Sequence, residues 1–314
     1  MGTDVVLEVD GLTKRYGECV AVRGLSFRVH RGEILGFLGP NGAGKTTSLK
    51  MMCGLLKPDH GKIEILGKPL VPGRSRGLRE VGVAPQNLVI WEMLTCLEQL
   101  ELVARLYDRP RSEAKQRAEH LLRVFGLQDK ARRLGRTLSG GMQRRLNIAL
   151  GLAHEPELLF LDEPQAGLDP QSRVMVRDYI QSLRGTMTVV ITTHDMEEAE
   201  KLADRVCVID HGEVLALDTV AGIKNQLGAG TVFEVCVDQD VREALLPAVA
   251  PLASPETFVA EAERLLVPAT GSAELLTQVL GAAGRLGLRI TAIRTREATL
   301  EDVFIRLTGR RLRE

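Results

Sequence analysis

The segment that most constrains the fold is the glycine-rich run 39–47, GPNGAGKTT, which satisfies the pattern GxxxxGK[ST]. It follows a short apolar run, Ile34–Leu38, which we expect to be a strand. It precedes Lys45–Leu56, which we expect to be a helix ending near Pro58. Glycines allow successive N–H groups to point at phosphate oxygens, and the helix presents its positive end to the same anion. The alternative is a glycine-rich turn that merely links a strand to a helix.

This pattern assigns two side-chain roles. The amine of Lys45 is expected to reach the β- and γ-phosphates of a nucleotide, and the hydroxyl of Thr46 is expected to bind magnesium. The full set of expected nucleotide contacts in the loop is Gly39, Pro40, Asn41, Gly42, Ala43, Gly44, Lys45, Thr46 and Thr47.

Apolar runs and helical segments alternate through the first two-thirds of the chain. Leu158–Leu161, Thr188–Thr192 and Val206–Ile209 are short apolar runs bounded by turn residues. Gln171–Leu183 and Met196–Ala203 have the spacing of helices. Buried strands that alternate with helices predict a largely parallel α/β core.

Two acids, Asp162 and Glu163, follow the apolar run Leu158–Leu161 directly. A buried strand does not keep unpaired carboxylates inside, so the pair must emerge at its end, where ligands collect in open α/β sheets. We expect Asp162 to hold magnesium and Glu163 to polarise the water that attacks the γ-phosphorus. The alternative is that both acids only cap the turn at Pro164.

Two further regions have patterns of their own. Leucines recur at helical spacing with charges between them over about residues 88–153, which predicts an inserted helical subdomain. A new pattern begins at Gly228-Ala229-Gly230, the expected linker, and runs β-α-β-β-α-β to predict a small split-βαβ sandwich. Its expected elements are strands at 231–237, 257–267 (one or two) and 288–293, and helices at 241–249, 273–283 and 300–307.

Composition excludes several classes of protein. Lys plus Arg equals Asp plus Glu at 41 each, so no overall field attracts nucleic acid or anionic lipid. No apolar run approaches the roughly 20 residues that span a bilayer, and Met1–Val9 lacks the pattern of a signal peptide. Five scattered cysteines without CxxC spacing indicate reduced core thiols and a cytoplasmic location, with a zinc site as the alternative.

The segment 138–145, LSGGMQRR, narrows the set of families to which the chain can belong. It resembles the LSGGQ hallmark of the ABC-type ATPases. Ser139 and the amides of Gly140 and Gly141 can form a second anion-binding helix N-terminus, and ordinary helix capping is the alternative. The resemblance implies that this corner closes in trans on ATP bound by a partner subunit, so that two ATP molecules are held at a dimer interface.

Other matches to these ATPases occur in the expected order, over roughly residues 5–225. The resemblance implies that Tyr16 stacks on adenine, although Tyr16 alone is only a strand-edge aromatic. Gln86 matches the glutamine that senses magnesium and couples to the membrane partner. Ala166–Asp169 matches the loop that communicates across the dimer, and His194 matches the switch histidine that contacts the γ-phosphate.

The resemblance implies an α/β fold with a P-loop NTPase core of the ABC ATPase type in residues 1–227. This core carries an N-terminal antiparallel β-subdomain and the helical subdomain at about 88–153. A small α+β accessory domain follows at 228–314, to which we assign a regulatory or dimer-supporting role. ATP and Mg²⁺ are the expected cofactors.

Two positions depart from the family pattern. Met142 replaces the usual glutamine of the signature, and Gln165 replaces a residue that is usually Ser or Thr. Neither change removes a phosphate donor or a catalytic acid, so ATP hydrolysis is still expected. The form SGGMxRRL and the C-terminal segments 300–304, LEDVF, and 307–309, LTG, are similar to exporter ATPases of the drug-resistance and nodulation-factor type.

The resemblance therefore implies an ATPase subunit of an exporter, peripheral on the cytoplasmic side of the membrane. Its expected partners are a separately encoded permease and a second copy or a related ATPase, without nucleic acid. An uptake ATPase and a soluble ABC ATPase are the alternatives. The helical subdomain after Gln86 is the family's docking surface, and it includes Trp91, the only tryptophan, beside Met93. Trp91 is predicted to contact the permease, or alternatively to fill the core of the subdomain.

Overall fold

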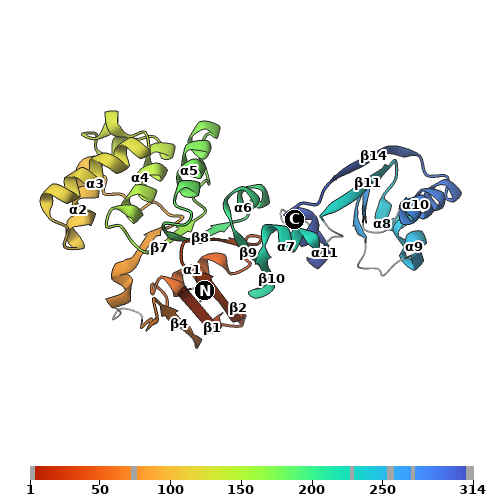
Figure 1. Cartoon of the computed structure of the whole chain (residues 1–314), viewed down its shortest axis with the longest axis horizontal. Helices are drawn as coiled ribbons and strands as arrows, with labels where there is room; N and C mark the ends of the chain where they lie inside the picture. Colours follow the sequence, from red (N-terminus) through yellow and green to blue (C-terminus); the bar gives the residue numbers. More distant parts are fainter. Residues whose placement is uncertain (1–3, 72–75, 227–229, 253–257, 270–272, 309–314) are drawn as a thin grey trace. The chain divides into compact units, whose positions relative to one another are not determined.

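The computed structural model describes residues 4–71, 76–226, 230–252, 258–269 and 273–308. The chain divides into two compact units between Leu215 and Ala216, and each is described by itself (Figure 1). Most of the expected linker, at 228 and 229, lies outside the described residues. The division into functional domains at 227/228 therefore stays a prediction.

An antiparallel sheet begins the first unit, as the family resemblance implies. Its strands lie in the order β2-β1-β4-β5, and the pairings of β1 with β2 and β4 and of β4 with β5 are antiparallel. A two-residue turn joins the end of β1 at Tyr16 to the start of β2 at Cys19. The strands are β1 (Val5–Tyr16), β2 (Cys19–His30), β4 (His60–Ile65) and β5 (Lys68–Pro69).

A six-stranded sheet forms the centre of this unit, in the order β10-β9-β3-β8-β7-β6. The pairings from β9 through β3, β8 and β7 to β6 are parallel, and every residue of β3, β7 and β8 is buried. Their carboxyl ends therefore meet at one edge of the sheet. The strands are β3 (Ile34–Leu38), β6 (Val81–Ala84), β7 (Leu158–Asp162), β8 (Thr188–Thr193), β9 (Arg205–Asp210) and β10 (Glu213–Thr219).

Helices complete the first unit, and three of them, α2, α3 and α4, lie within residues 88–153 and gather at one end of it (Figure 1). Leu100, Leu121, Phe125 and Leu146 pack in their shared core. The helices are α1 (Lys45–Met52), α2 (Cys96–Leu106), α3 (Arg111–Val124), α4 (Gly140–Leu152), α5 (Pro170–Ser182) and α6 (Met196–Leu202).

The first helix is shorter than the sequence pattern predicts. It ends at Met52 instead of Leu56 because Gly54 adopts a left-handed φ of 70°. The N–H groups of Leu55 and Leu56 then both return to the carbonyl oxygen of Lys50, at 2.9 and 3.0 Å. The helix is closed by this glycine, before the chain reaches Pro58.

The second unit contains the predicted split-βαβ sheet. Its order is β12-β13-β11-β14, and the three pairings between neighbours are antiparallel. One of its faces packs on helices through Val235, Leu245, Leu265 and Val279. The elements are α7 (Val220–Asn225), β11 (Thr231–Val237), α8 (Val241–Ala244), α9 (Leu246–Val249), β12 (Val259–Glu261), β13 (Arg264–Pro268), α10 (Ala273–Arg285), β14 (Ile290–Glu297) and α11 (Leu300–Thr308).

The helix expected at 241–249 is divided into α8 and α9 at Leu245. Pro247 lies in the first turn of α9, where its missing N–H costs nothing, whereas one continuous helix would lose a hydrogen bond there. The region expected at 257–267 forms two short strands, and Thr257 lies outside the described residues. The last expected strand, 288–293, is displaced to Ile290–Glu297.

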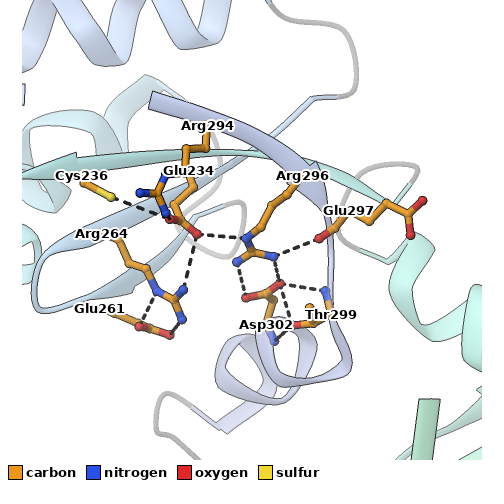
Figure 2. A network of polar contacts seen from close by, with 9 residues as sticks. All are labelled: Glu234, Cys236, Glu261, Arg264, Arg294, Arg296, Glu297, Thr299 and Asp302. Atoms are coloured by element: carbon orange, nitrogen blue, oxygen red, sulfur yellow. Dashed lines mark hydrogen bonds and ion pairs between the residues drawn. The ribbon is translucent and has the colours of Figure 1, made fainter. Parts of the chain in front are cut away.

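A buried polar network ties α11 to the sheet of the second unit (Figure 2). The Arg296 guanidinium donates to both carboxylate oxygens of Asp302, at 2.6 and 2.9 Å, and to Glu234 at 2.9 Å. Asp302 is only 1% exposed and also caps α11 by accepting from the N–H of Thr299. The network fixes how the LEDVF segment begins its helix.

The lengths and compositions of the helices also bear on membrane insertion. Within the described ranges, none of them combines the length and apolar character that a bilayer crossing requires.

Candidate nucleotide site

The phosphate loop follows β3 and needs glycine at defined positions. A Cβ atom at Gly39 would overlap the carbonyl oxygen of Ile209, and one at Gly44 would overlap that of Ala21. Gly42 and Gly44 also have left-handed φ values of 84° and 98°. Gly44 combines a left-handed φ with a close backbone approach, Gly39 has the close approach alone and Gly42 the φ alone, so each position requires glycine for a distinct reason.

The helix that follows the loop lacks the cap that most of its neighbours have. The N-cap of α1 is Gly44, which offers no side-chain acceptor. By contrast, α2, α4, α5 and α6 are capped by the side chains of Thr95, Ser139, Asp169 and Asp195. The first N–H groups of α1 are therefore available to an anion, and the helix dipole favours one there.

Lys45 begins this helix and folds back over the loop. Its Nζ donates to the carbonyl oxygens of Gly39 at 2.6 Å and Pro40 at 3.0 Å. Burial lowers the pKa of Lys45, while the charges of Glu163 and Asp162 oppose that shift. A buried ammonium whose hydrogen bonds go to neutral carbonyl oxygens is suited to receive a more negative acceptor such as phosphate.

The carboxylate of Glu163 lies between the ammonium of Lys45 and the imidazole of His194. Its Oε1 is 3.8 Å from Lys45 Nζ, and its Oε2 is 2.6 Å from His194 Nδ1. Glu163 itself has a left-handed φ of 52°, which is uncommon for a residue other than glycine. The turn after β7 thus aims the Glu163 side chain at the residue that follows β8.

Asp162 is the last residue of β7 and is 2% exposed. The hydroxyl of Thr192 on the adjacent strand donates to its Oδ1. Asp162, the hydroxyl of Thr46 and the amide of Gln86 are hard oxygen donors of the kind that magnesium prefers. Across the described residues, no group of three His, Cys, Asp or Glu side chains forms a ready metal site. Three oxygen donors fill only half of the octahedral shell that magnesium takes, so this donor set fits an ion whose other ligands are phosphate oxygens and water.

A cavity of about 260 Å³ joins the phosphate loop to Gln86 and Glu163, and Asp162 and His194 are not among its lining residues. Gln86, which follows β6 and is exposed, reaches it from a different segment of the chain than Lys45 or Glu163. The sequence predictions for these three residues thus converge on one site. The lining residues are Ala21, Asn41, Gly42, Gly44, Lys45, Thr46, Thr47, Gln86 and Glu163.

The signature residues do not line that cavity. Ser139 caps α4 by accepting from the N–H of Met142 at 3.3 Å, and Gly140 has open space around the position of a Cβ atom. Asp169 caps α5 and lies 3.6 Å from where a Cβ of Gly141 would be. Within one chain, therefore, this helix N-terminus is exposed and contributes no residue to the lining of the nucleotide cavity.

Tyr16 is not among the residues that line the cavity either. It ends β1, is 52% exposed, and has Lys14 Nζ at 5.9 Å from its ring centroid. An exposed aromatic ring can stack on a base. Its predicted contact with adenine stays a prediction.

A second hollow, about 290 Å³, lies beside the helical subdomain. Trp91, 40% exposed, lines it together with Leu55, Val89 and Tyr107. Met93 is 68% exposed and is not among the lining residues. The tryptophan is therefore neither a buried core residue nor an isolated surface residue, since it forms one wall of an apolar groove.

Sequence reasoning gave Arg144 no role, yet it is 5% exposed and contacts both the Gln86 and Glu163 segments. The available signal was its position three residues before Asn147, among apolar residues of α4. The adjacent Arg145 looks the same in sequence, so the pattern alone could not separate them.

Comparison with known proteins agrees with this geometry. Residues 22–166 match the family model described as ABC transporter. The chain is 42% identical to a daunorubicin resistance ATP-binding protein of Streptomyces coeruleorubidus, with 99% of each chain covered. It is 37% identical to the linearmycin resistance ATP-binding protein of Bacillus subtilis, covering 98% of this chain and all of the relative. It is 40% identical to the Nod factor export ATP-binding protein I of Ralstonia nicotianae, covering 100% and 97%.

Solved structures are similar over roughly two-thirds of the chain or slightly more. An ATP-binding subunit of an ABC transporter superposes with a TM-score of 0.66 at 32% identity, covering 71% of this chain and 94% of that one. A dimeric ATP-binding cassette, solved in a post-hydrolysis state with ADP and phosphate, gives 0.63 at 27% identity, covering 68% and 98%. Together with the loop, the carboxylates and the signature helix, these similarities show that the chain belongs to the ATP-binding proteins of ABC transporters.

Proposed function

We propose that this chain is the ATP-hydrolysing subunit of an exporter and works as a dimer beneath a separately encoded membrane permease. The observation that carries the proposal is the convergence of Lys45, Gln86 and Glu163 on one cavity at the carboxyl edge of the sheet. Export is favoured over uptake because the resistance and Nod factor export proteins are similar over 98–100% of this chain, the second unit included.

Nucleotide binding uses groups that are already oriented. Lys45 Nζ exchanges the carbonyl oxygens of Gly39 and Pro40 for phosphate oxygens, and the uncapped N–H groups of α1 bind the same anion. Thr46, Asp162 and Gln86 hold magnesium together with the phosphates. When bound, the ion neutralises charge on the transferred phosphoryl group.

Hydrolysis depends on the carboxylate of Glu163. It holds the attacking water and accepts its proton, while His194 at 2.6 Å and Lys45 at 3.8 Å limit its rotation. In this scheme His194 also contacts the γ-phosphate, and Tyr16 stacks on the adenine.

Dimerisation completes each site. Ser139, Gly140 and Gly141 close on the ATP of the partner subunit. In one chain this helix N-terminus is exposed, and the cavity with the phosphate loop lies at a different place on the same chain, so a second copy is needed to bring the two together. The solved dimer of a similar ATP-binding cassette supports pairing of two copies. The groove at Trp91 receives the permease, and the second unit supports the dimer or regulates it.

The test is ATP hydrolysis by the purified full-length chain with and without magnesium. We expect magnesium-dependent hydrolysis in the wild type, an ATP-bound dimer in Glu163→Gln, and weakened nucleotide binding in Lys45→Ala. Light scattering and bound-nucleotide analysis measure the dimer. Hydrolysis by Glu163→Gln at the wild-type rate would show that another residue activates the water.

A further inference from the structure

Arg144 makes an unusual set of contacts for a residue on the signature helix. Its side chain leaves the second turn of α4 and is 5% exposed. Nη1 donates to the carbonyl oxygens of Gln86 at 2.6 Å and Pro85 at 3.1 Å. Nη2 donates to Asp162 O at 2.7 Å and to Glu163 O, and Nε lies 3.4 Å from Pro164 O. One guanidinium therefore bonds five carbonyls of two chain segments.

These contacts require an arginine. Burial lowers the pKa of Arg144, and the charges of Asp162, Glu163 and Glu198 oppose that shift. No carboxylate of the described chain forms an ion pair with it within 4.0 Å, so carbonyl oxygens satisfy its charge. The planar fork of five donors matches this arrangement, whereas a lysine ammonium has only three donors at one point.

On one side, the guanidinium holds the turn that carries Glu163. The left-handed φ of 52° at this residue is strained for a side chain other than glycine and persists only where neighbours fix it. The Glu163 N–H donates to Thr192 O at 3.0 Å and to Thr192 Oγ1 at 3.1 Å, and Arg144 binds the carbonyls that follow. The backbone of Glu163 is thus held from both ends, which sets the direction of its carboxylate.

On the other side, the same face of α4 holds the Gln86 segment. Asn147, one turn after Arg144, donates to Pro85 O at 3.1 Å and accepts from the N–H of Val89 at 3.0 Å. Arg144 binds Gln86 O between these two contacts. The segment that leads from Gln86 to the groove at Trp91 is therefore attached to the signature helix by two side chains.

We infer that Arg144 is a positioning residue that fixes the Glu163 carboxylate for water activation and ties it to the Gln86 segment. The inference rests on the proposed function, because it acts through the proposed catalytic role of Glu163. A displacement of the Gln86 segment changes the hydrogen bonds at the Glu163 turn through one rigid guanidinium. Hydrolysis in one chain is thereby linked to the groove where the permease is proposed to dock.

The test compares Arg144→Lys with Arg145→Lys in the full-length chain. Arg145 is the adjacent arginine of α4, but its Nη1 donates to Phe125 O at 2.7 Å inside the helical subdomain. We expect Arg144→Lys to lower kcat for ATP by roughly 10–100-fold, since small misplacements at a reacting centre cost that much. The ATP Kd and KM should stay within about threefold, and Arg145→Lys should stay within about twofold of wild-type kcat.

A double-mutant comparison separates positioning from folding. Because Arg144 acts through Glu163, adding Arg144→Lys to Glu163→Gln should cause no further loss in single-turnover hydrolysis. Arg144→Gln, which leaves no buried cation, should show the same kcat loss if the lysine variant does not fold. Wild-type kcat in either variant overturns the inference, as does a parallel loss of ATP binding and thermal stability. A wild-type chain that binds ATP without hydrolysing it overturns the proposed function instead.

Discussion

The Nδ1 atom of His194 lies 2.6 Å from the Oε2 atom of Glu163, although the two residues follow different strands and are 31 positions apart. The parallel pairing of β7 with β8 brings these strand ends together. Lys45 Nζ lies 3.8 Å from the other oxygen of the same carboxylate. The carboxylate is therefore flanked on both of its oxygens by side chains of the protein itself.

Replacement of His194 tests the importance of this orientation. His194→Ala should lower kcat by roughly 10²–10³-fold, because the Glu163 carboxylate loses one of the two groups that limit its rotation. Its ATP Kd should change little, since Lys45 and the loop amides remain. Steady-state hydrolysis and equilibrium binding of ATP measure the two effects. An unchanged kcat would mean that Lys45 alone orients Glu163.

Gly140→Ala tests the trans role of the signature helix. The added methyl meets no atom within 4 Å in one chain, so stability should change by less than about 1 kcal/mol. The methyl should nevertheless obstruct the approach of the partner's phosphates and reduce the ATP-bound dimer of the Glu163→Gln protein at least tenfold. Gly284→Ala in α10, which also has open space, is the matched control. Light scattering with ATP distinguishes the two variants.

Trp91→Ala tests the groove as the permease contact. Transport by the complex should fall about tenfold, while ATP binding should be retained. The Trp91 N–H donates to the side chain of Gln99 and the Trp91 carbonyl accepts from the N–H of Leu94, and both backbone hydrogen bonds survive the substitution. Partial burial limits the stability cost to about 1–2 kcal/mol. Leu286→Ala, an exposed leucine of the second unit, is the control. A joint loss of folding and nucleotide binding would instead assign Trp91 to the core.

Glu198 should make stability depend on pH. Burial raises its pKa from an ordinary value near 4.5 to about 7, and the hydrogen bond from Thr193 Oγ1 at 2.6 Å offsets this only in part. Because the pKa of Glu198 is higher in the folded than in the unfolded chain, the protonated carboxyl contributes fully to folding stability below pH 4.5. This contribution to stability is lost as the pH rises through about 7.

Glu198→Gln cannot ionise and should gain stability relative to wild type between pH 5 and 8, by about 2–3 kcal/mol. Calorimetry across this range measures the difference. Glu197→Gln is the control variant, because it removes one exposed carboxylate from the same helix, α6, and so measures the effect of the lost charge alone. A difference that does not vary with pH would show that Glu198 does not titrate in this window.

Asp302→Asn should destabilise the second unit by roughly 2–3 kcal/mol, since the half-buried Arg296 loses two charge-assisted hydrogen bonds and keeps only Glu234 as a carboxylate partner. Burial opposes ionisation of Asp302, but Arg296 and Thr299 outweigh it and lower its pKa below the ordinary value of 3.8. The ionised Asp302 therefore stabilises the folded state at neutral pH. This stabilisation is lost as the pH falls below 3.8 toward the pKa that Asp302 has in the folded protein.

Arg294→Gln, an exposed arginine 4.0 Å from Glu234, should change stability by less than about 1 kcal/mol. Calorimetry of the full-length proteins measures both variants, and ATP binding reports on the first unit. Equal stability losses in the two variants would contradict a special role for the buried pair.

Much of the fold could be predicted because its signals are local. The buried strands β3, β7, β8 and β9, the split-βαβ sheet and the carboxylates at the end of β7 follow from apolar runs and turn residues in short windows, whereas the N-terminal antiparallel sheet was implied only by the family resemblance. Errors occurred where one residue's backbone decided the result. Gly54 ends α1 four residues early, and Pro247 divides the helix expected at 241–249.

The sequence by itself determined that this chain has a phosphate loop, two acids after a buried strand and a helix N-terminus with the ABC signature. These are contiguous patterns whose chemistry depends on neighbours along the chain. Only the tertiary structure decided that Arg144, and not Arg145, bonds the Gln86 and Glu163 segments, and that Trp91 lines a groove. The physical reason is that the acceptors of Arg144 lie 18–59 positions away, and sheet pairing brings them within reach of one side chain.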